Sequence, residues 1–453
     1  MKQTIKKLLY EKNIASLGSN VIAAILGLLS FLLLTRSLSK IDFGDWVLYI
    51  TLASFTDLLR FGLTRTALVR FITGAGDEEK KAFLGTSFKI NILLVGLITI
   101  ICWPVAFILS ETGVEINNGY LLFLKWYPLL ALVNLSWNNA MSLFQAEQRF
   151  MTMLIVQAIN LLVFVVFLAI NLIFLRLDLT VIVVFHMFTN LLSSVYCIAK
   201  KWDGLAYLKK SGKEFQRKLL DFGKFSMGTL IGSSLLKSAD TFIIGLSPVL
   251  GSAGIAMYAI PLKLTDLLGI PLRAFTMTAY PKMAQMHKNG NLTELRKIFY
   301  SYTGVITLLF IPVAIIGYFL AAPLVLFLGG NEYKDSLPLL VSIFRIFTLY
   351  TLFLPYDRFT GVLLDSINKP KLNLYKVIVM AAANVIGDII GVFVFNSLEV
   401  VAIVTIVFTV IGIWIGNHYL AKEIQLKIFP VFTEGILFFK NIKNVILNKD
   451  GTF

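Results

Sequence analysis

Charged side chains inside long apolar runs are the residues of this sequence that could do chemistry. Three acid–cation pairs lie well inside such runs, three residues apart: Asp57 with Arg60, Lys237 with Asp240, and Lys263 with Asp266. Because residues three apart share one face of a helix, each pair can neutralise itself locally. An ionised group at the centre of a bilayer costs at least about 2.5–3.5 kcal/mol on insertion scales. We therefore expect the pairs to line an internal cavity, with structural pairing between helices as the alternative.

Arginines without a close acid are the stronger candidates for binding a ligand. Arg273 and Arg345 have no acid at helical spacing within their own run, apart from Asp266 two turns before Arg273. Arg65 likewise follows Asp57 by about two turns. We expect these three arginines and the cations of the three pairs to contact a ligand's negative charge.

Asp388 is the acid whose role is most open. It lies slightly past the middle of its apolar run, between Gly387 and Gly391, whose small side chains permit close helix contact. A desolvated Asp388 would titrate, and a paired one would neutralise a neighbouring cation. For Asp57, Asp240, Asp266 and Asp388 we expect charge pairing or ion coupling.

The sign of the charge inside the runs favours an anionic ligand. Five acids lie there: Asp57, Asp240, Asp266, Asp357 and Asp388. Nine cations accompany them: Arg60, Arg65, Lys89, Lys125, Lys237, Lys263, Arg273, Arg345 and Arg358. Fixed cations in a partly dry site gain most from a phosphate or a carboxylate. Lys89, Lys125 and Arg358 lie near the ends of their runs, where we expect their side chains to reach the headgroups.

Membrane-spanning helices must position these charges. Of the 453 residues, 57% are hydrophobic and 15% charged, and the mean hydropathy is +0.80, which excludes an ordinary soluble protein. A span needs roughly 20 mostly apolar residues. Twelve runs qualify: residues 14–35, 43–69, 84–108, 119–143, 152–175, 179–199, 222–246, 252–276, 299–320, 337–357, 372–396 and 398–420. The sequence predicts an all-α polytopic membrane protein with two six-helix lobes around a central cavity.

The distribution of Lys and Arg sets the expected topology. With a cytoplasmic N-terminus, 28 cations border the inner side and 4 the outer side, as the positive-inside rule requires. Both ends are then cytoplasmic, and no removable signal peptide is expected. We expect an N-terminal lobe at residues 1–199, a basic cytoplasmic hinge loop at 200–221, a C-terminal lobe at 222–420 and an amphipathic tail at 421–453. The Lys and Arg residues expected on the cytoplasmic side therefore account for the net charge of +15, and nucleic acid is not an expected partner.

A short internal repeat supports the two-lobe arrangement. Thr56-Asp57-Leu58-Leu59 recurs as Thr265-Asp266-Leu267-Leu268, at an offset of 209 residues. The repeat equates the second helix of each half across the basic loop. Transporters are commonly duplicated in this way, with the substrate site between the repeats.

Signals for enzymatic chemistry are absent from the sequence. It contains no G-x-x-x-x-G-K-[ST] phosphate loop. The three histidines, His186, His287 and His418, are not at a metal-ligand spacing, and Cys102 and Cys197 lie inside apolar runs. We expect no catalytic residue, no metal and no cofactor.

Two stretches carry a resemblance to a known family. The first runs from Ala15 to Phe71 and includes Leu34-Thr35-Arg36-Ser37-Leu38, Asp42-Phe43-Gly44, Tyr49, Phe61-Gly62-Leu63 and Ala67-Leu68-Val69-Arg70. The second runs from Lys237 to Met283 and includes Asp240, Gly245, Tyr258 and Tyr280-Pro281. Both resemble the bacterial polysaccharide-repeat-unit flippases of the multidrug/oligosaccharidyl-lipid/polysaccharide exporter superfamily. The resemblance adds Arg36 to the substrate-binding candidates, with a headgroup anchor as its alternative role.

The resemblance implies a flippase in the bacterial cytoplasmic membrane. Its cargo would be a polyprenyl-pyrophosphate-linked oligosaccharide for O-antigen, capsule or exopolysaccharide synthesis, moved by alternating access. Membrane lipids, a polysaccharide polymerase and other assembly proteins are the further candidate partners. Two other classes stay open: a drug or small-molecule antiporter, which would favour an acid-rich cavity, and a polytopic membrane enzyme, which would favour a long exterior loop.

Overall fold

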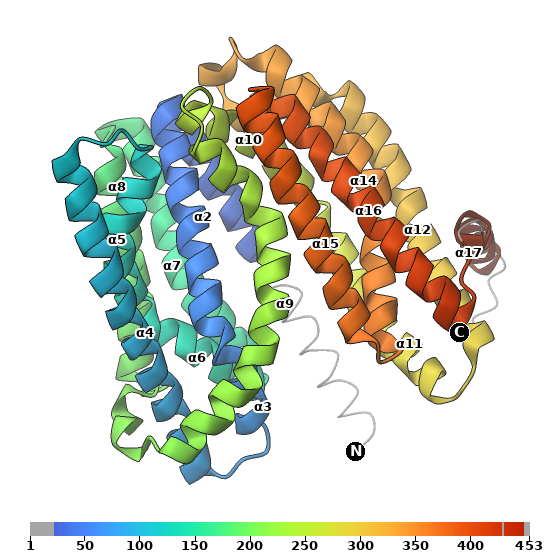
Figure 1. Cartoon of the computed structure of the whole chain (residues 1–453), viewed down its shortest axis with the longest axis horizontal. Helices are drawn as coiled ribbons and strands as arrows, with labels where there is room; N and C mark the ends of the chain where they lie inside the picture. The colour runs from blue at the N-terminus through green and yellow to red at the C-terminus, as the bar shows by residue number, and fades with distance from the viewer. Residues whose placement is uncertain (1–21, 428–429, 448–453) are drawn as a thin grey trace. The chain divides into compact units, whose positions relative to one another are not determined.

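The computed structural model describes residues 22–427 and 430–447, except for the side chains of residues 225, 226, 228, 229, 439 and 441–447. Its secondary structure throughout that part of the chain is helical (Figure 1). The chain divides into two compact units. Unit 1 comprises Met1–Ser234 and Gly251–Ala256, and unit 2 comprises Leu235–Leu250 and Met257–Phe453.

The helices of the described residues match the predicted apolar runs. Seven are long and apolar enough to span a membrane: α4 (Asp77–Thr112), α7 with the π-helix η1 (Phe150–Leu175), α8 (Leu179–Ala199), α12 (Leu292–Phe319), α14 (Leu337–Ser366), α15 with the π-helix η4 (Pro370–Val394) and α16 (Leu398–Ile424). Three bent pairs also pass: α2 (Lys40–Gly62) with α3 (Arg65–Ile72), α5 (Asn118–Val133) with α6 (Leu135–Ala146), and α10 (Gly251–Asp266) with α11 (Gly269–Lys288). Of the predicted run 14–35, residues 14–21 lie outside the described residues and the rest falls within the shorter helix Ile22–Ser37. The predicted run 222–246 falls almost entirely within α9 (Lys213–Gly245). The predicted all-α membrane fold is confirmed.

Polar caps mark where several of these helices begin. Ser39 accepts a hydrogen bond from the backbone N–H of Asp42 before α2, and Asn291 accepts one from Glu294 before α12. Such caps satisfy backbone donors that would otherwise have no partner at a helix end. Short helices at the connections complete the described structure: η2 (Leu205–Lys210), α13 (Ala321–Gly329), η3 (Asn331–Tyr333) and α17 (Pro430–Leu447).

The two helices equated by the repeat are both bent. α2 and α3 meet at 41°, and α10 and α11 meet at 43°. The bends differ in register, because α10 ends at Asp266 of the repeat whereas α2 continues past Asp57 to Gly62. Each break lies next to a charged residue of its unit, Arg65 or Asp266, a feature that apolar run length alone does not reveal.

The basic segment before α9 packs within unit 1. Asp203 is buried and accepts a hydrogen bond from Ser136 at 2.9 Å, and Asn139 donates to its backbone carbonyl. Gly204 has a φ of +99°, and a Cβ there would lie 2.5 Å from the carbonyl oxygen of Leu84, so only glycine fits. These contacts hold η2 on α4. The boundary between the units falls further along, within α9.

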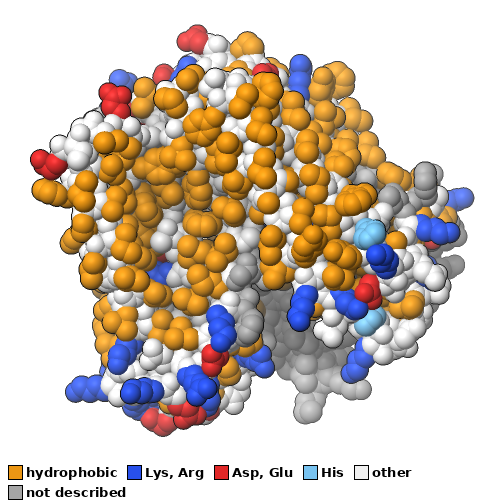
Figure 2. All heavy atoms as spheres, in the orientation of Figure 1, with side chains coloured by type: hydrophobic (Ala, Val, Ile, Leu, Met, Phe, Trp, Pro, Cys, Tyr) orange, Lys and Arg blue, Asp and Glu red, His pale blue; other side chains and the backbone are white. Residues whose placement is uncertain are grey.

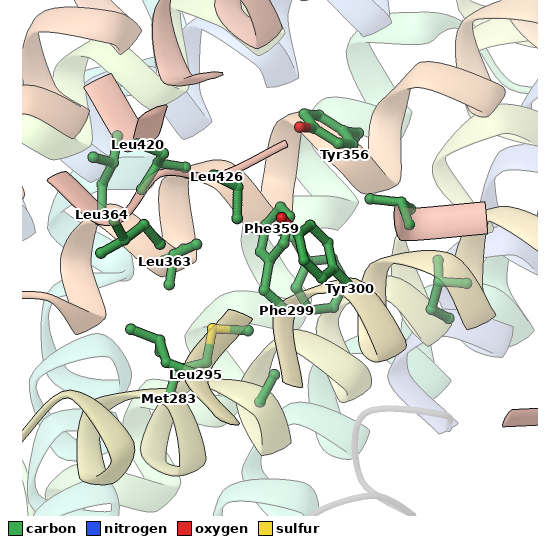
Figure 3. Packing of buried hydrophobic residues seen from close by; sticks show 14 of the residues in the cluster. Met283, Leu295, Phe299, Tyr300, Tyr356, Phe359, Leu363, Leu364, Leu420 and Leu426 are labelled. Atoms are coloured by element: carbon green, nitrogen blue, oxygen red, sulfur yellow. The ribbon is translucent and has the colours of Figure 1, made fainter. Parts of the chain in front are cut away.

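Apolar packing forms the interior of each unit, and apolar side chains also cover its outside. A buried cluster of unit 2 includes residues of α11, α12, α14 and α16; Figure 3 shows Phe299, Tyr300 and Phe359 close together in it, and the ring centroids of Phe299 and Tyr356 lie 5.8 Å apart. Figure 2 shows hydrophobic side chains across the middle of each unit's visible face, with many Lys and Arg side chains of unit 1 at its lower end. This pattern is what a lipid-facing surface requires.

Candidate functional site

Four cations and one acid from four helices gather in unit 2. Lys237 interacts electrostatically with Arg273, Arg358 and Asp266, and Asp266 interacts in turn with Lys263. The side chains of Lys237, Asp266, Arg273 and Arg358 are all exposed. We call this set the cationic cluster; it comprises Lys237 of α9, Lys263 and Asp266 of α10, Arg273 of α11 and Arg358 of α14.

The cationic cluster is suited to holding an anion. Its four cations exceed its single acid by three charges, and like charges repel unless a counter-ion lies between them. Among the residues that the structure describes, Arg273 donates one hydrogen bond, from Nε to the carbonyl of Gly269 in its own helix at 3.3 Å, which leaves most of its guanidinium donors for other partners. A diphosphate, with several oxygens for bidentate and point-charge contacts, matches this set.

A buried group of oxygen atoms forms a second feature of unit 2. Asp240 is 6% exposed and Asp388 0% exposed, and their carboxyl groups lie within hydrogen-bonding reach of each other. Asp240 accepts hydrogen bonds from the Tyr258 hydroxyl at 2.5 Å and from Asn384 Nδ2 at 2.9 Å. The Thr405 hydroxyl lies beside that of Tyr258. We call these five side chains, from α9, α10, α15 and α16, the oxygen cluster.

The oxygen cluster lacks a positive partner among the residues that the structure describes. No donor of that part of the chain reaches either carboxyl oxygen of Asp388 or the amide oxygen of Asn384. Two adjacent carboxylates in a dry site cannot both stay ionised without a compensating charge. A shared proton or a small hard cation, which prefers oxygen ligands, would supply that charge.

The Asp57–Arg60 pair of unit 1 forms as expected and also joins two helices. Arg60 Nη2 lies 2.7 Å from Asp57 Oδ1, and its Nη1 donates to the carbonyl of Ala131 at 2.8 Å. Asp57 also accepts from Tyr127 at 2.8 Å and from Asn134 at 3.2 Å. The pair thus links α2 to α5. This is the structural pairing between helices that we gave as the alternative to cavity lining.

Loss of the Arg60 guanidinium should destabilise unit 1. In Arg60→Ala, the buried end of α2 loses its bond to α5, and Asp57 keeps a largely enclosed charge without its cation. Removing one partner of a buried ion pair costs about 3–5 kcal/mol. We expect a clear fall in the thermal unfolding midpoint of the purified protein in detergent. An unchanged midpoint would show that the pair does not hold α2 and α5 together.

Lys237 and Asp240 separate although they are three residues apart on α9. Lys237 lies in the cationic cluster, and Asp240 lies in the oxygen cluster. Lys263 and Asp266 stay within interaction distance of each other. Local spacing therefore places each pair on one helix face, but tertiary contacts decide the partners.

The other predicted arginines lie apart from the cationic cluster or in the other unit. Arg345 donates from Nε to the carbonyl of Tyr318 at 3.3 Å, and its guanidinium stacks 4.7 Å from that residue's ring centroid. Arg65 of α3 lies 3.5 Å from the side-chain oxygen of Gln145. Arg36 is exposed in the last turn of the helix Ile22–Ser37.

Two further charges differ in place from the sequence expectation. Arg358, expected at the headgroups, lies in the cationic cluster. Lys376, counted with the cytoplasmic cations, is 2% exposed and lies 2.6 Å from Asp357, with a bond to Thr360 at 2.9 Å. The available signal was Gly412-x-x-x-Gly416 of α16: a Cβ at either glycine would lie 2.9 Å from an oxygen of Asp357 or Thr360.

The Lys376–Asp357 ion pair yields a prediction about stability. Lys376→Met leaves a buried carboxylate without its cation, which should cost about 3–5 kcal/mol. A second change, Asp357→Leu, removes the stranded charge and should restore much of the loss. Thermal unfolding of both variants in detergent measures this. If the double variant is no more stable than Lys376→Met, charge pairing is not what these residues contribute.

Tyr127, Asn134, Tyr258, Asn384 and Thr405 are site residues that the sequence analysis missed. They are uncharged polar residues in apolar runs, which mostly have structural partners in membrane helices. Four of them bond to Asp57 or Asp240, and Thr405 lies beside Tyr258. Helix packing sets these contacts.

Two family models match the chain. One, described as polysaccharide biosynthesis protein, matches residues 9–287, and one described as MatE matches residues 226–390. No curated protein sequence matches it.

Three solved structures share this fold at low sequence identity. An inward-facing multidrug resistance MATE family transporter of the MOP superfamily has a TM-score of 0.72 at 16% identity, over 88% of this chain and 95% of that one. The lipid II flippase MurJ, in an inward closed conformation, has a TM-score of 0.68 at 15% identity, over 96% and 93%. A MOP superfamily transporter from Pyrococcus furiosus, described as having a binding pocket of reverse polarity, has a TM-score of 0.62 at 15% identity, over 90% and 94%. The shared fold is that of MOP-superfamily transporters.

Proposed function

We propose, from the premise that this chain belongs to the polysaccharide biosynthesis protein family, that it exports a polyprenyl-pyrophosphate-linked oligosaccharide across the bacterial cytoplasmic membrane. The family and the fold support a multi-pass membrane transporter or flippase. The cargo, the cytoplasmic position of the chain ends and the use of the product in O-antigen, capsule or exopolysaccharide synthesis are our proposals. A polysaccharide polymerase or another assembly protein would then take over the exported unit.

The cationic cluster is the observation that carries this proposal. Lys237, Lys263, Arg273 and Arg358 come from four helices, and Lys237, Arg273 and Arg358 are exposed. The four cations outnumber the single acid of the cluster, Asp266. The diphosphate is the part of the proposed cargo that is charged whichever glycan it carries, so it is the part that the cluster would hold. The polyprenyl chain is uncharged and would contribute no electrostatic selectivity.

The oxygen cluster supports cation-coupled transport. Lys237 of the cationic cluster and Asp240 of the oxygen cluster are three residues apart on α9, which separates them by about 4.5 Å along the helix axis. A cation or proton at Asp240 and Asp388 would change the electric field at the cationic cluster and hence its affinity for an anion. Such a coupling is reciprocal, so the anion would change the cation affinity by the same factor.

A drug antiporter is the second candidate, because the oxygen cluster alone could bind and exchange cations. A MATE transporter with the same fold is described as multidrug resistance. The cationic cluster favours an anion instead, since a cationic drug beside it would be repelled. The two functions differ in the ligand they predict.

A binding experiment separates the two candidates. The purified protein in nanodiscs would be titrated with polyprenyl diphosphate, polyprenyl monophosphate and uncharged polyprenol, which share the same tail. We expect affinity to fall in that order and the diphosphate affinity to weaken with salt. Equal affinities for all three, together with tighter binding of a cationic drug, would favour the antiporter.

A further inference from the structure

The last described helix of unit 2, α17, lies across the bundle rather than along it. Figure 1 looks almost down the axis of α17, whereas α12, α14 and α16 run across the same view. Membrane-spanning helices are tilted by about 20° on average from the bilayer normal. If α12, α14 and α16 span the membrane, α17 lies close to the membrane plane.

One stripe of α12 holds the chain as it leaves α16. Arg296 Nη1 donates to the last carbonyl of α16, at Ile424, at 3.1 Å, and the backbone N–H of Lys427 donates to the Tyr300 hydroxyl at 2.9 Å. Between them, Gln425 has a φ of +53°, which turns the chain sharply. Arg296, Tyr300 and Gly304 follow at four-residue spacing, so they share one face of α12.

Glycines let α17 touch α12 at the next position of that stripe. A Cβ at Gly304 would lie 2.1 Å from the carbonyl oxygen of Val431, and one at Gly435 would lie 2.7 Å from the carbonyl carbon of Gly304. Only glycine permits backbones to approach this closely. α17 is therefore fixed to α12 at a defined height.

That height corresponds to a membrane–water boundary. The first two turns of α12 carry Glu294, Arg296 and Lys297, and its predicted span begins at residue 299. Gly304 lies five residues further, about 8 Å along the helix axis. Interfacial helices bury their apolar face about 5–10 Å into the headgroup and acyl boundary.

The exposed side of α17 is apolar and flanked by lysines. Phe432, Ile436 and Leu437 are 47%, 58% and 46% exposed. Lys427 precedes the helix, and Lys440 follows on an exposed position. Aromatic and aliphatic side chains next to lysines match the acyl boundary and the negative headgroups of a membrane surface.

We propose that α17 is an interfacial anchor that binds anionic phospholipid at the leaflet bordering the first turns of α12. Insertion of Phe432 and Ile436 sets its depth, and Lys427 and Lys440 contact the headgroups. Because Gly304 and Gly435 link it to α12, the anchor fixes the height of α12 in the bilayer. The inference is independent of the transported cargo.

A fluorescence experiment in proteoliposomes tests this position. An environment-sensitive dye would be attached to Ile436→Cys in a full-length protein whose Cys102 and Cys197 are changed to Ala. The same dye on Glu332→Cys, an exposed residue of η3, is the matched control for water exposure. The vesicles contain phosphatidylcholine and phosphatidylglycerol, with or without lipids brominated near the start of the acyl chains.

We expect blue-shifted emission at position 436 that brominated lipids quench at least about twofold more than at position 332. Emission resembling position 332 would overturn the proposal, and so would blue-shifted emission that brominated lipids leave unchanged, since that would indicate a protein partner. Brominated lipids should quench the dye at position 436 less in vesicles without phosphatidylglycerol. They should also quench it less in the Lys427→Gln/Lys440→Gln variant. Equal quenching in these cases would refute the anionic preference.

Discussion

Transport by Asp388→Asn is expected to lose its response to a cation gradient and to slow by at least about tenfold. The side chain of Asp388 is fully buried beside that of Asp240, and an amide can neither take up a proton nor supply the second negative charge for a metal ion. A tenfold change corresponds to about 1.4 kcal/mol of lost coupling. Asn keeps the size of the side chain, so packing against α16 is preserved.

The measurement is uptake into proteoliposomes under imposed sodium or pH gradients. Asp365→Asn is the matched control, because Asp365 is a half-buried carboxylate of the same unit that bonds to Asn373 at 3.0 Å. The control should keep the gradient response. A full response in Asp388→Asn would remove the oxygen cluster from the coupling mechanism.

Substitutions in the cationic cluster should change diphosphate affinity in opposite directions. Arg358→Ala or Lys237→Ala removes one of four cations and should weaken binding of polyprenyl diphosphate about ten- to a hundredfold, because charge-assisted hydrogen bonds contribute about 1.5–3 kcal/mol. Asp266→Asn removes the only acid of the cluster and should strengthen binding. A structural role alone would not improve affinity when a residue is removed.

Arg345→Ala is the control for these variants. Its guanidinium bonds to Tyr318, at the end of α12, so we expect diphosphate affinity close to that of the unmodified protein. Titration in nanodiscs at two salt concentrations provides the measurement. Weaker binding in Asp266→Asn, or a loss in Arg345→Ala equal to that in Arg358→Ala, would contradict the assignment of the cluster.

The fold could be predicted from the sequence because span length is a strong physical constraint. Each apolar run had to be long enough to cross the bilayer, and it had to be helical so that its backbone N–H and C=O groups are hydrogen-bonded within the run. The 41° and 43° bends could not be predicted, since residues 63–64 and 267–268 interrupt helices without interrupting the apolar run. The fold of residues 203–210 on α4 was also missed, because it depends on Gly85 and Gly204 contacting backbone far away in sequence.

The charges of the site could be found from the sequence, but their partners could not. Spacing of three residues paired Asp57 with Arg60 correctly, because both also face α5. The same spacing also paired Lys237 with Asp240, but Asp240 accepts a hydrogen bond from Asn384 of α15 instead. Lys376 was placed at a helix end by its position in the chain, and its contacts with α14 and α16 show that it is buried.

We propose that the exported cargo is a diphosphate-linked glycan. The most direct measurement is transbilayer movement of a fluorescent polyprenyl-diphosphate oligosaccharide in proteoliposomes, with the monophosphate analogue and a cationic drug as parallel cargoes. Our account predicts movement of the diphosphate cargo that requires Arg358 and responds to a cation gradient. Movement of the cationic drug, with none of the diphosphate cargo, would contradict it.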